Sequence, residues 1–317
     1  MGRISQRAAR TGFTLIEMVV VMLILALLTH LAVRETGRLQ AARLQRQADR
    51  QLEEVRDAVW LRNAAGEATG FLADLGRLPR ALVATNEAGL VVRTLSELWR
   101  RPADVAPFDL RPATAENLAV PAEEKAALAD AAVIVPCGWR GPYLRLPFGR
   151  DRLLDPWGNP LETPDDAGFA RLFVATNEPS ARAAHLVGHV RHLGADARPD
   201  DQVTPATPAD RDHGLDLLPP GGLANRLVVR TQFVNATGPA GLTGEAVCRW
   251  YMPCGSAITG AVEKVAVAGL SYATFSFAGL PPGTCQLAVS VGGTNRALTQ
   301  VEVPPGGREV QLNVLIP

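Results

Sequence analysis

Lysine is almost absent from this sequence. Only Lys125 and Lys264 occur, and arginine supplies the rest of the positive charge. Lysine and arginine together number 32, as do aspartate and glutamate, so the formal net charge is zero. A neutral chain argues against a basic nucleic-acid-binding surface, and we expect no nucleic-acid partner.

Cysteine is scarce too, and the common catalytic motifs are missing. The four cysteines contain no C-x-x-C pair, which argues against a zinc ribbon or a thioredoxin-like site. The patterns G-x-S-x-G and H-E-x-x-H, a Walker loop, and G-x-G-x-x-G before a helix do not occur. We therefore expect a protein that is not an enzyme and that requires no cofactor.

The composition is nevertheless that of a folded chain. Of 317 residues, 47% are hydrophobic and 20% are charged, which is too apolar for a disordered protein. The length predicts about two domains. The 29 glycines and 24 prolines indicate many turns between the elements.

One long apolar run lies near the N-terminus. It covers residues 13–33, which are 21 residues, and follows a start that contains Arg3, Arg7 and Arg10 but no acid. As a helix this run would be about 31 Å long, the thickness of a bilayer core. The arginines favour a cytoplasmic start, with the rest of the chain beyond the inner membrane, in the periplasm.

Three interpretations of this run compete. A cleaved secretory signal needs small residues before the cut, and His30 and Leu31 before Ala32 fit that pattern poorly. A plain single-span anchor does not explain Glu17, because a carboxylate inside a membrane helix costs about 2.5 kcal/mol or more and usually has a partner.

The third interpretation rests on the motif G-F-T-L-I-E at residues 12–17. It resembles the cleavage motif of type IV pilins and type II secretion pseudopilins. The resemblance implies that prepilin peptidase cuts after Gly12 and methylates the new amine of Phe13. It also implies that Glu17 pairs with the amine of a neighbouring subunit in a filament. The implied partners are the peptidase, other pilin or pseudopilin subunits, and an inner-membrane assembly platform.

The helix is predicted to continue beyond the membrane. A stripe of apolar residues recurs at spacings of 4, 4, 3 and 4, as on one face of an amphipathic helix: Leu44, Ala48, Leu52, Val55 and Val59. Residues 63–66 are typical of a helix end. We therefore expect a leader at 1–12 and a pilin helix at 13–65, of which 13–33 cross the membrane.

The middle of the chain carries a second resemblance. The stretch G-P-Y-L at 141–144, followed by D-P-W-G-N-P at 155–160, resembles the major pseudopilin of type II secretion. It implies a pilin-like globular domain at 66–198, with the helix packed on a small antiparallel sheet. Residues 169–175 and 186–193 are expected to be strands. Residues 101–132 are predicted to be an insertion that is mostly loop, with one helix at 122–132.

The sequence L-G-A-D at 193–196 resembles the calcium loop of the same family. The resemblance implies Asp196 as a ligand, with Asp200 and Asp201 as candidates for the others, because hard oxygen ligands suit Ca²⁺. Ala197 stands where the family usually has glycine. The alternative interpretation is a solvated acidic linker.

A separate β module is predicted at the C-terminus. A linker rich in proline and glycine covers 199–221, and short alternating strands with glycine and proline turns follow at 222–317. These strands predict a β-sandwich. Residues 277–289 resemble the carboxypeptidase-regulatory, prealbumin-like domains, with Cys285 where an aromatic residue is common. The expected fold class is thus α+β: a long N-terminal helix on a small antiparallel sheet, followed by an all-β sandwich.

The cysteines of the β module are candidates for disulfides, because the compartment beyond the inner membrane is oxidising. Cys248 with Cys254 is the first candidate pair, and either of them with Cys285 is the next. Sequence alone does not fix the connectivity.

Together these features favour a pseudopilin-like or pilin-like structural subunit in the inner membrane, with its bulk in the periplasm. The bulk of the β module favours a minor or capping subunit over the repeating one. The alternative is a binding module, an adhesin or a substrate receptor, in which the pilin part only delivers the β module.

Overall fold

The computed structural model describes residues 15–64, 68–85, 91–161, 163, 188–196, 204–205, 210–217, 225–235, 238–239, 241–292, 295–304 and 306–315. It combines one long N-terminal helix with antiparallel sheets, and 44% of the described residues are in strands. This confirms the expected α+β class with a β-sandwich.

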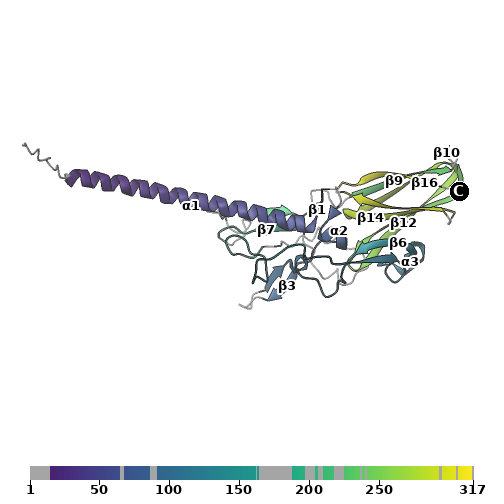
Figure 1. Cartoon of the computed structure of the whole chain (residues 1–317), viewed down its shortest axis with the longest axis horizontal. Coiled ribbons are helices and arrows are strands. Elements are labelled where there is room, and N and C mark those ends of the chain that lie inside the picture. Colours follow the sequence, from purple (N-terminus) through teal and green to yellow (C-terminus); the bar gives the residue numbers. More distant parts are fainter. Residues whose placement is uncertain are drawn as a thin grey trace, which may run out of the picture. The chain divides into compact units, whose positions relative to one another are not determined.

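The long helix α1 spans Leu15–Val59 (Figure 1). It belongs to two structural units. One unit is Met1–Gln47 and the other is Ala48–Pro317. Within the second unit the helix buries Ala48, Leu52, Val55 and Val59, which are members of the predicted apolar stripe. The helix ends at Val59, before the expected 63–66, because the chain then enters a strand, β1 (Leu61–Arg62), that pairs with β2 (Ala68–Thr69).

The buried part of α1 packs on a core formed by the middle of the chain. The helix α2 (Phe71–Leu75) and the short 3₁₀ helix η1 (Ser96–Leu98) contribute to it, and the ladder of β3 (Leu82–Thr85) and β4 (Val91–Thr94) lies between them in sequence. The fully buried members of this core are Val55, Val59, Phe71, Leu72, Leu75, Leu78, Leu98, Val190 and Leu217.

Two strands after the middle region complete this core. The strand β7 (His189–His192) pairs with β8 (His213–Asp216), and Val190 points into the core. β7 lies within the strand expected at 186–193. The other expected strand, 169–175, lies outside the described residues.

The C-terminal part is a sandwich of two four-stranded sheets. Its strands are β9 (Asn225–Asn235), β10 (Gly238–Pro239), β11 (Leu242–Cys254), β12 (Ala257–Leu270), β13 (Tyr272–Leu280), β14 (Gly283–Val291), β15 (Asn295–Val303) and β16 (Arg308–Leu315). One sheet has the order β10-β9-β13 with β16 parallel to β9, and the other has the order β12-β11-β14-β15.

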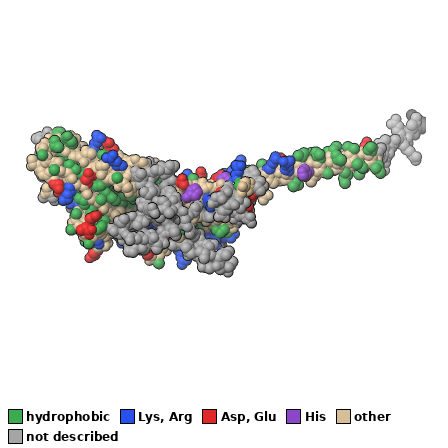
Figure 2. All heavy atoms as spheres, turned by 180° about the vertical axis from the view of Figure 1, so that it is seen from behind, with side chains coloured by type: hydrophobic (Ala, Val, Ile, Leu, Met, Phe, Trp, Pro, Cys, Tyr) green, Lys and Arg blue, Asp and Glu red, His purple; other side chains and the backbone are tan. Residues whose placement is uncertain are grey.

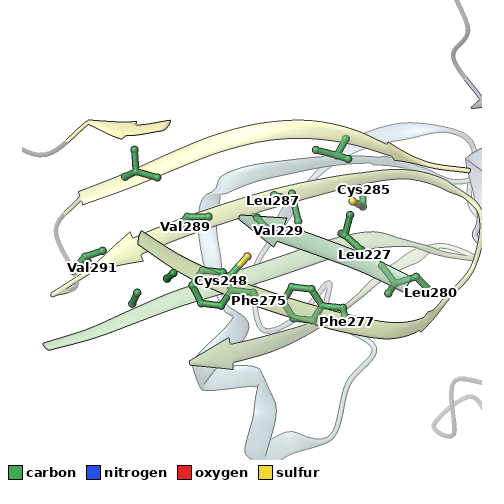
Figure 3. Close-up of a cluster of buried hydrophobic side chains, with 14 of the residues drawn as sticks. Leu227, Val229, Cys248, Phe275, Phe277, Leu280, Cys285, Leu287, Val289 and Val291 are labelled. Atoms are coloured by element: carbon green, nitrogen blue, oxygen red, sulfur yellow. The ribbon is translucent and has the colours of Figure 1, made fainter. Parts of the chain in front are cut away.

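Alternate residues of the two sheets fill the space between them. Leu227 and Val229 of β9 and Phe275 and Phe277 of β13 point toward Cys248, Leu287 and Val289 of the other sheet (Figure 3). Period-two burial on both sheets is what the alternating sequence predicts. The side chains of the residues that alternate with these along each strand therefore point to the outer faces of the sandwich.

A third layer covers the outer face of the β11-containing sheet. It is made by β5 (Asp109–Ala113), α3 (Ala122–Leu128) and β6 (Asp130–Cys137). Leu128, Val133 and Val135 form a core with Tyr251 and Ile258 of the sandwich. Residues 101–132 contain the expected helix as α3, and they also supply β5 and the start of β6. Their few apolar side chains are buried against the sandwich.

Candidate functional site

The N-terminal half of α1 is an apolar surface. Its large side chains are exposed, among them Leu15 at 83%, Met22 at 66% and Leu23 at 65%. Figure 2 shows this band of hydrophobic side chains, with arginines following it along the helix. Among the described residues, α1 is the one helix long and apolar enough to cross a membrane.

Polar groups within the apolar part of α1 are few, and the helix satisfies one of them itself. The hydroxyl of Thr29 donates to the carbonyl oxygen of Leu25 at 2.7 Å, so it presents no unsatisfied donor to lipid. Glu17 lies in the first turn of the helix and is exposed. Gly12 and Phe13, where cleavage and methylation are expected, lie outside the described residues.

The D-P-W-G-N-P loop forms a compact turn around Asp155, which is buried. Its Oδ1 accepts the backbone N–H groups of Trp157 at 3.0 Å and Asn159 at 2.7 Å. The backbone N–H of Asp155 donates to the carbonyl oxygen of Asn159 at 2.7 Å. A carboxylate that accepts its own loop's N–H groups fixes the turn that proline and glycine allow.

This loop is tied both to α1 and to the turn after β7. The Nδ2 of Asn159 donates to the carbonyl oxygen of Gly194 at 2.9 Å. The Nε2 of Gln51 on α1 donates to the carbonyl oxygen of Leu154 at 2.8 Å. The loop thus connects the helix base to the L-G-A-D turn.

His192 of β7 completes the connection and was not singled out by the sequence as a helix contact. It is fully buried, and its Nε2 lies 2.9 Å from the carbonyl oxygen of Ala48. Its Nδ1 lies 3.9 Å from Oδ2 of Asp155, and its ring stands edge-on to that of Trp157 with centroids 6.5 Å apart. Burial lowers the pKa of His192, although the Ala48 carbonyl and Asp155 act in the opposite direction.

The G-P-Y-L stretch is held in place by a buried ionic network. Trp139 donates from Nε1 to the carbonyl oxygen of Glu97 at 2.9 Å. The carboxylate of Glu97 is fully buried and accepts two bonds from Arg77, at 2.7 and 3.0 Å, and one from Nε of Arg80, at 2.6 Å. Because every oxygen of this carboxylate is paired with a cation, the charge is tolerated in the core.

Tyr143 fixes the same stretch to α2. Its hydroxyl donates to Oδ2 of Asp74 at 3.0 Å, and its ring stands edge-on to Phe71. Burial raises the pKa of Asp74, while Arg140 and the Tyr143 hydroxyl partly oppose that rise. The D-P-W-G-N-P loop is thus bonded to α1, whereas the G-P-Y-L stretch is fixed to η1 and α2 within the globular part.

One comparison with known protein families matches the N-terminal part of the chain. The family described as "Prokaryotic N-terminal methylation motif" matches residues 7–33. That match contains the expected cut site, Glu17 and the exposed apolar half of α1. The findings support a type IV pilin-like protein.

Comparisons over the rest of the chain carry no further argument. No curated protein matches this chain. Among solved structures, the crystal structure of chlorocatechol 1,2-dioxygenase from Pseudomonas putida is similar with a TM-score of 0.19 and 13% identity. That similarity covers 29% of this chain and 60% of the dioxygenase chain.

The expected calcium loop is only partly described. Asp196 lies in the turn that follows β7, whereas Asp200 and Asp201 lie outside the described residues. Within the described part of the chain, no group of three or more His, Cys, Asp or Glu side chains could hold a metal ion. Asp196 and its described neighbours thus do not form a site by themselves, and calcium binding stays a prediction.

The structure contradicts the first disulfide candidate. Cys248 and Cys254 lie on the same strand, β11, whose pairing with β12 runs without a break between them. Six residues of extended strand separate their Cα atoms by about 20 Å, far beyond the reach of a disulfide. Cys285 is a buried free thiol, so its expected pairing with either of the other two is not observed. Burial raises the pKa of Cys285 to about 12.

Proposed function

We propose that this type IV pilin-like protein is a structural subunit, rather than an enzyme, of a periplasmic pseudopilus or a pilus of a secretion system. Prepilin peptidase cuts it after Gly12 and methylates Phe13, and α1 then carries it into the filament. The methylation motif at residues 7–33, placed directly on an exposed apolar helix, is the observation that carries the proposal.

The apolar half of α1 drives assembly because its side chains need a cover. Each large apolar side chain that leaves water gains about 1.5–3 kcal/mol, so this surface is stable only in lipid or against other helices. The inner membrane supplies the cover before assembly, and helices of neighbouring subunits supply it in the filament.

Glu17 sets the register of that packing. After cleavage the amine of Phe13 is a cation at the start of the apolar helix. A carboxylate on a neighbouring helix that pairs with it removes the cost of an isolated charge in an apolar setting, which amounts to several kcal/mol. The pair forms at one axial offset between subunits.

Cleavage is tested by substitution at the expected cut site. With co-expressed prepilin peptidase, G12L is expected to stay at full length, whereas the matched control G2L is expected to be shortened like the wild type. Cleavage of G12L at the same place would contradict the assigned cut site.

Assembly is tested at the acidic residue. E17A is expected to be cleaved but to be missing from sheared filaments. The control is E35A, which removes an exposed carboxylate beyond the apolar run, paired with Arg38 at 2.9 Å. It is expected to assemble normally. Equal incorporation of both variants would show that Glu17 has no role in packing.

The subunit's place in the filament follows from its bulk. The sandwich and its third layer enlarge the globular part, which favours a minor or capping position. Electron microscopy of the purified processed protein is expected to show no long uniform filaments, and filaments of this chain alone would contradict that position.

A further inference from the structure

The two outer faces of the sandwich differ in what covers them. On the β11-containing sheet, the outward residues Tyr251 and Ala288 are buried by the third layer. On the β9-containing sheet, the outward residues Arg230, Gln232 and Thr274 are exposed. The face of β9, β13 and β16 is therefore the open face of the sandwich, opposite the core side chains that Figure 3 shows.

The open face carries a hollow of about 410 Å³. Its lining comes from β9, from β16, and from β13 with the preceding residue, Ser271, so it lies on the outer side of one sheet and not between the two sheets. The volume falls in the range of about 300–1,000 Å³ that is usual for small-molecule sites.

Side chains in the hollow are arranged in two rows across three strands. In the first row, Gln232 of β9 stands opposite Tyr272 of β13 and opposite Asn313 of β16. In the second row, Arg230 stands opposite Thr274 and Gln311. Residues directly opposite on one face have Cβ atoms about 5 Å apart, so each row offers a continuous line of polar groups.

The side chains of these rows carry no net charge, and they both donate and accept hydrogen bonds. Amide side chains supply N–H donors and carbonyl acceptors, and hydroxyls do both. The one cation, Arg230, is held by Glu309 on the next strand at 2.9 Å, which cancels its charge. These two rows therefore offer neither an unpaired cation for phosphates nor an unpaired carboxylate for cations. Arg226, an exposed residue elsewhere on β9, donates to the hydroxyl of Ser276 at 2.8 Å.

Tyr272 adds an aromatic surface at the edge of the hollow. It is 59% exposed, so its ring is accessible to a ligand. An aromatic ring beside amides and hydroxyls matches a ligand that has both an apolar C–H face and a rim of hydroxyls. Sugars have this combination.

We propose that the open face of β9, β13 and β16 binds a neutral oligosaccharide. The Tyr272 ring contacts the C–H face of a sugar unit, and Gln232, Asn313 and Gln311 bind its hydroxyls. This role goes beyond filament assembly and does not depend on it, because none of these residues lies on α1.

The test is a calorimetric titration of the full chain, purified in a detergent without a sugar headgroup. The probes are cellopentaose, xylopentaose, chitopentaose and maltopentaose. At least one is expected to bind with a Kd below about 1 mM. If none of the four binds, the proposal is overturned.

Variants locate the binding on this face. Y272A is expected to weaken binding by about tenfold, because an aromatic contact contributes about 0.5–1.5 kcal/mol. Y272F keeps the ring and loses only the hydroxyl, so it is expected to retain more affinity than Y272A. Q300A removes an exposed amide on the other sheet and is expected to change nothing.

Two results would overturn the location even if a sugar binds. One is equal affinity of Y272A and wild type, with both showing the same thermal unfolding. The other is a self-association of the wild type that Y272A abolishes, which would make the face an interface between copies of the chain.

Discussion

The hydroxyl of Tyr251 in β11 donates a hydrogen bond of 2.9 Å to the carbonyl oxygen of Leu128, the last residue of α3. Both groups are buried, and they come from parts of the chain that the sequence assigns to different domains. This bond joins the middle of the chain to the C-terminal sandwich. Parallel bridging of Leu118 with Ile258 does the same nearby.

Loss of this hydroxyl should lower stability measurably. Y251F leaves the buried Leu128 carbonyl without its donor, and we expect the free energy of unfolding to fall by about 1 kcal/mol. Chemical unfolding of the chain in detergent measures the change. Y272F removes an exposed hydroxyl and serves as the matched control, with an expected change close to zero. Equal stability of both variants would mean that the third layer is not joined through Tyr251.

A second contact between the same parts is tested at a glycine. Gly76 ends α2 with φ of 65°, and a Cβ there would lie 1.7 Å from the carbonyl oxygen of Pro253 in β11. Gly279 has a similar φ of 71° but open space around it. G279A should therefore cost only the backbone strain of about 1 kcal/mol, and G76A should cost clearly more. Similar melting temperatures for the two variants would argue against this close approach.

Because of His192, the free energy of unfolding should decrease as the pH is lowered. The folded chain keeps this imidazole neutral, since burial lowers its pKa below the ordinary value of 6.5. Below about pH 6.5 the unfolded chain takes up a proton that the folded chain does not, so the free energy of unfolding decreases as the pH falls toward the lowered pKa. The loss is at most about 1.4 kcal/mol per pH unit.

Comparison of unfolding at pH 7.5 and pH 5.5 measures this effect. Asp155, Asp49 and His213 are the charged or titratable groups that act on His192, and they are unchanged in H192Q. H192Q should lose less stability than the wild type over this interval, whereas H30Q, which alters an exposed histidine, should lose the same amount. An unchanged pH dependence in H192Q would exclude His192 as the cause.

The cysteines provide a chemical test of the sandwich. Cys248 and Cys285 are buried free thiols, and burial raises the pKa of each. Both should resist alkylation by iodoacetamide in the folded chain and react after unfolding, because the thiolate is the reactive form. Peptide mapping of the native protein should find no bond between Cys248 and Cys254. A bond between them would contradict the continuous pairing of β11.

The sequence predicted the elements whose periodicity is local. The stripe from Ala48 to Val59 is buried as expected, and the turn chemistry of Asp155, Gly158 and Asn159 gives the compact loop that was expected. The alternation of β14 and β16 places Leu287 and Val314 in a core, as their spacing indicates.

What the sequence did not predict depends on contacts between distant segments. Residues 101–132 are mostly polar, so their composition does not indicate that they form part of the third layer. Their packing depends on a few apolar side chains, including Leu118 and Leu128. The contact of His192 with α1 was not predicted either, because its partner is the backbone carbonyl of Ala48 and no sequence motif indicates such a contact. The disulfide prediction for Cys248 and Cys254 was wrong for a similar reason: both cysteines, with the five residues between them, lie on the single strand β11.

The intact mass of the membrane-extracted protein, with and without co-expressed prepilin peptidase, tests the central claim most directly. A pilin-like subunit should lose residues 1–12 and gain one methyl group on Phe13 only when the peptidase is present. An uncut chain in both cases, or a cut near Ala32, would mean that the motif is not used and that α1 is a simple anchor or a secretory signal.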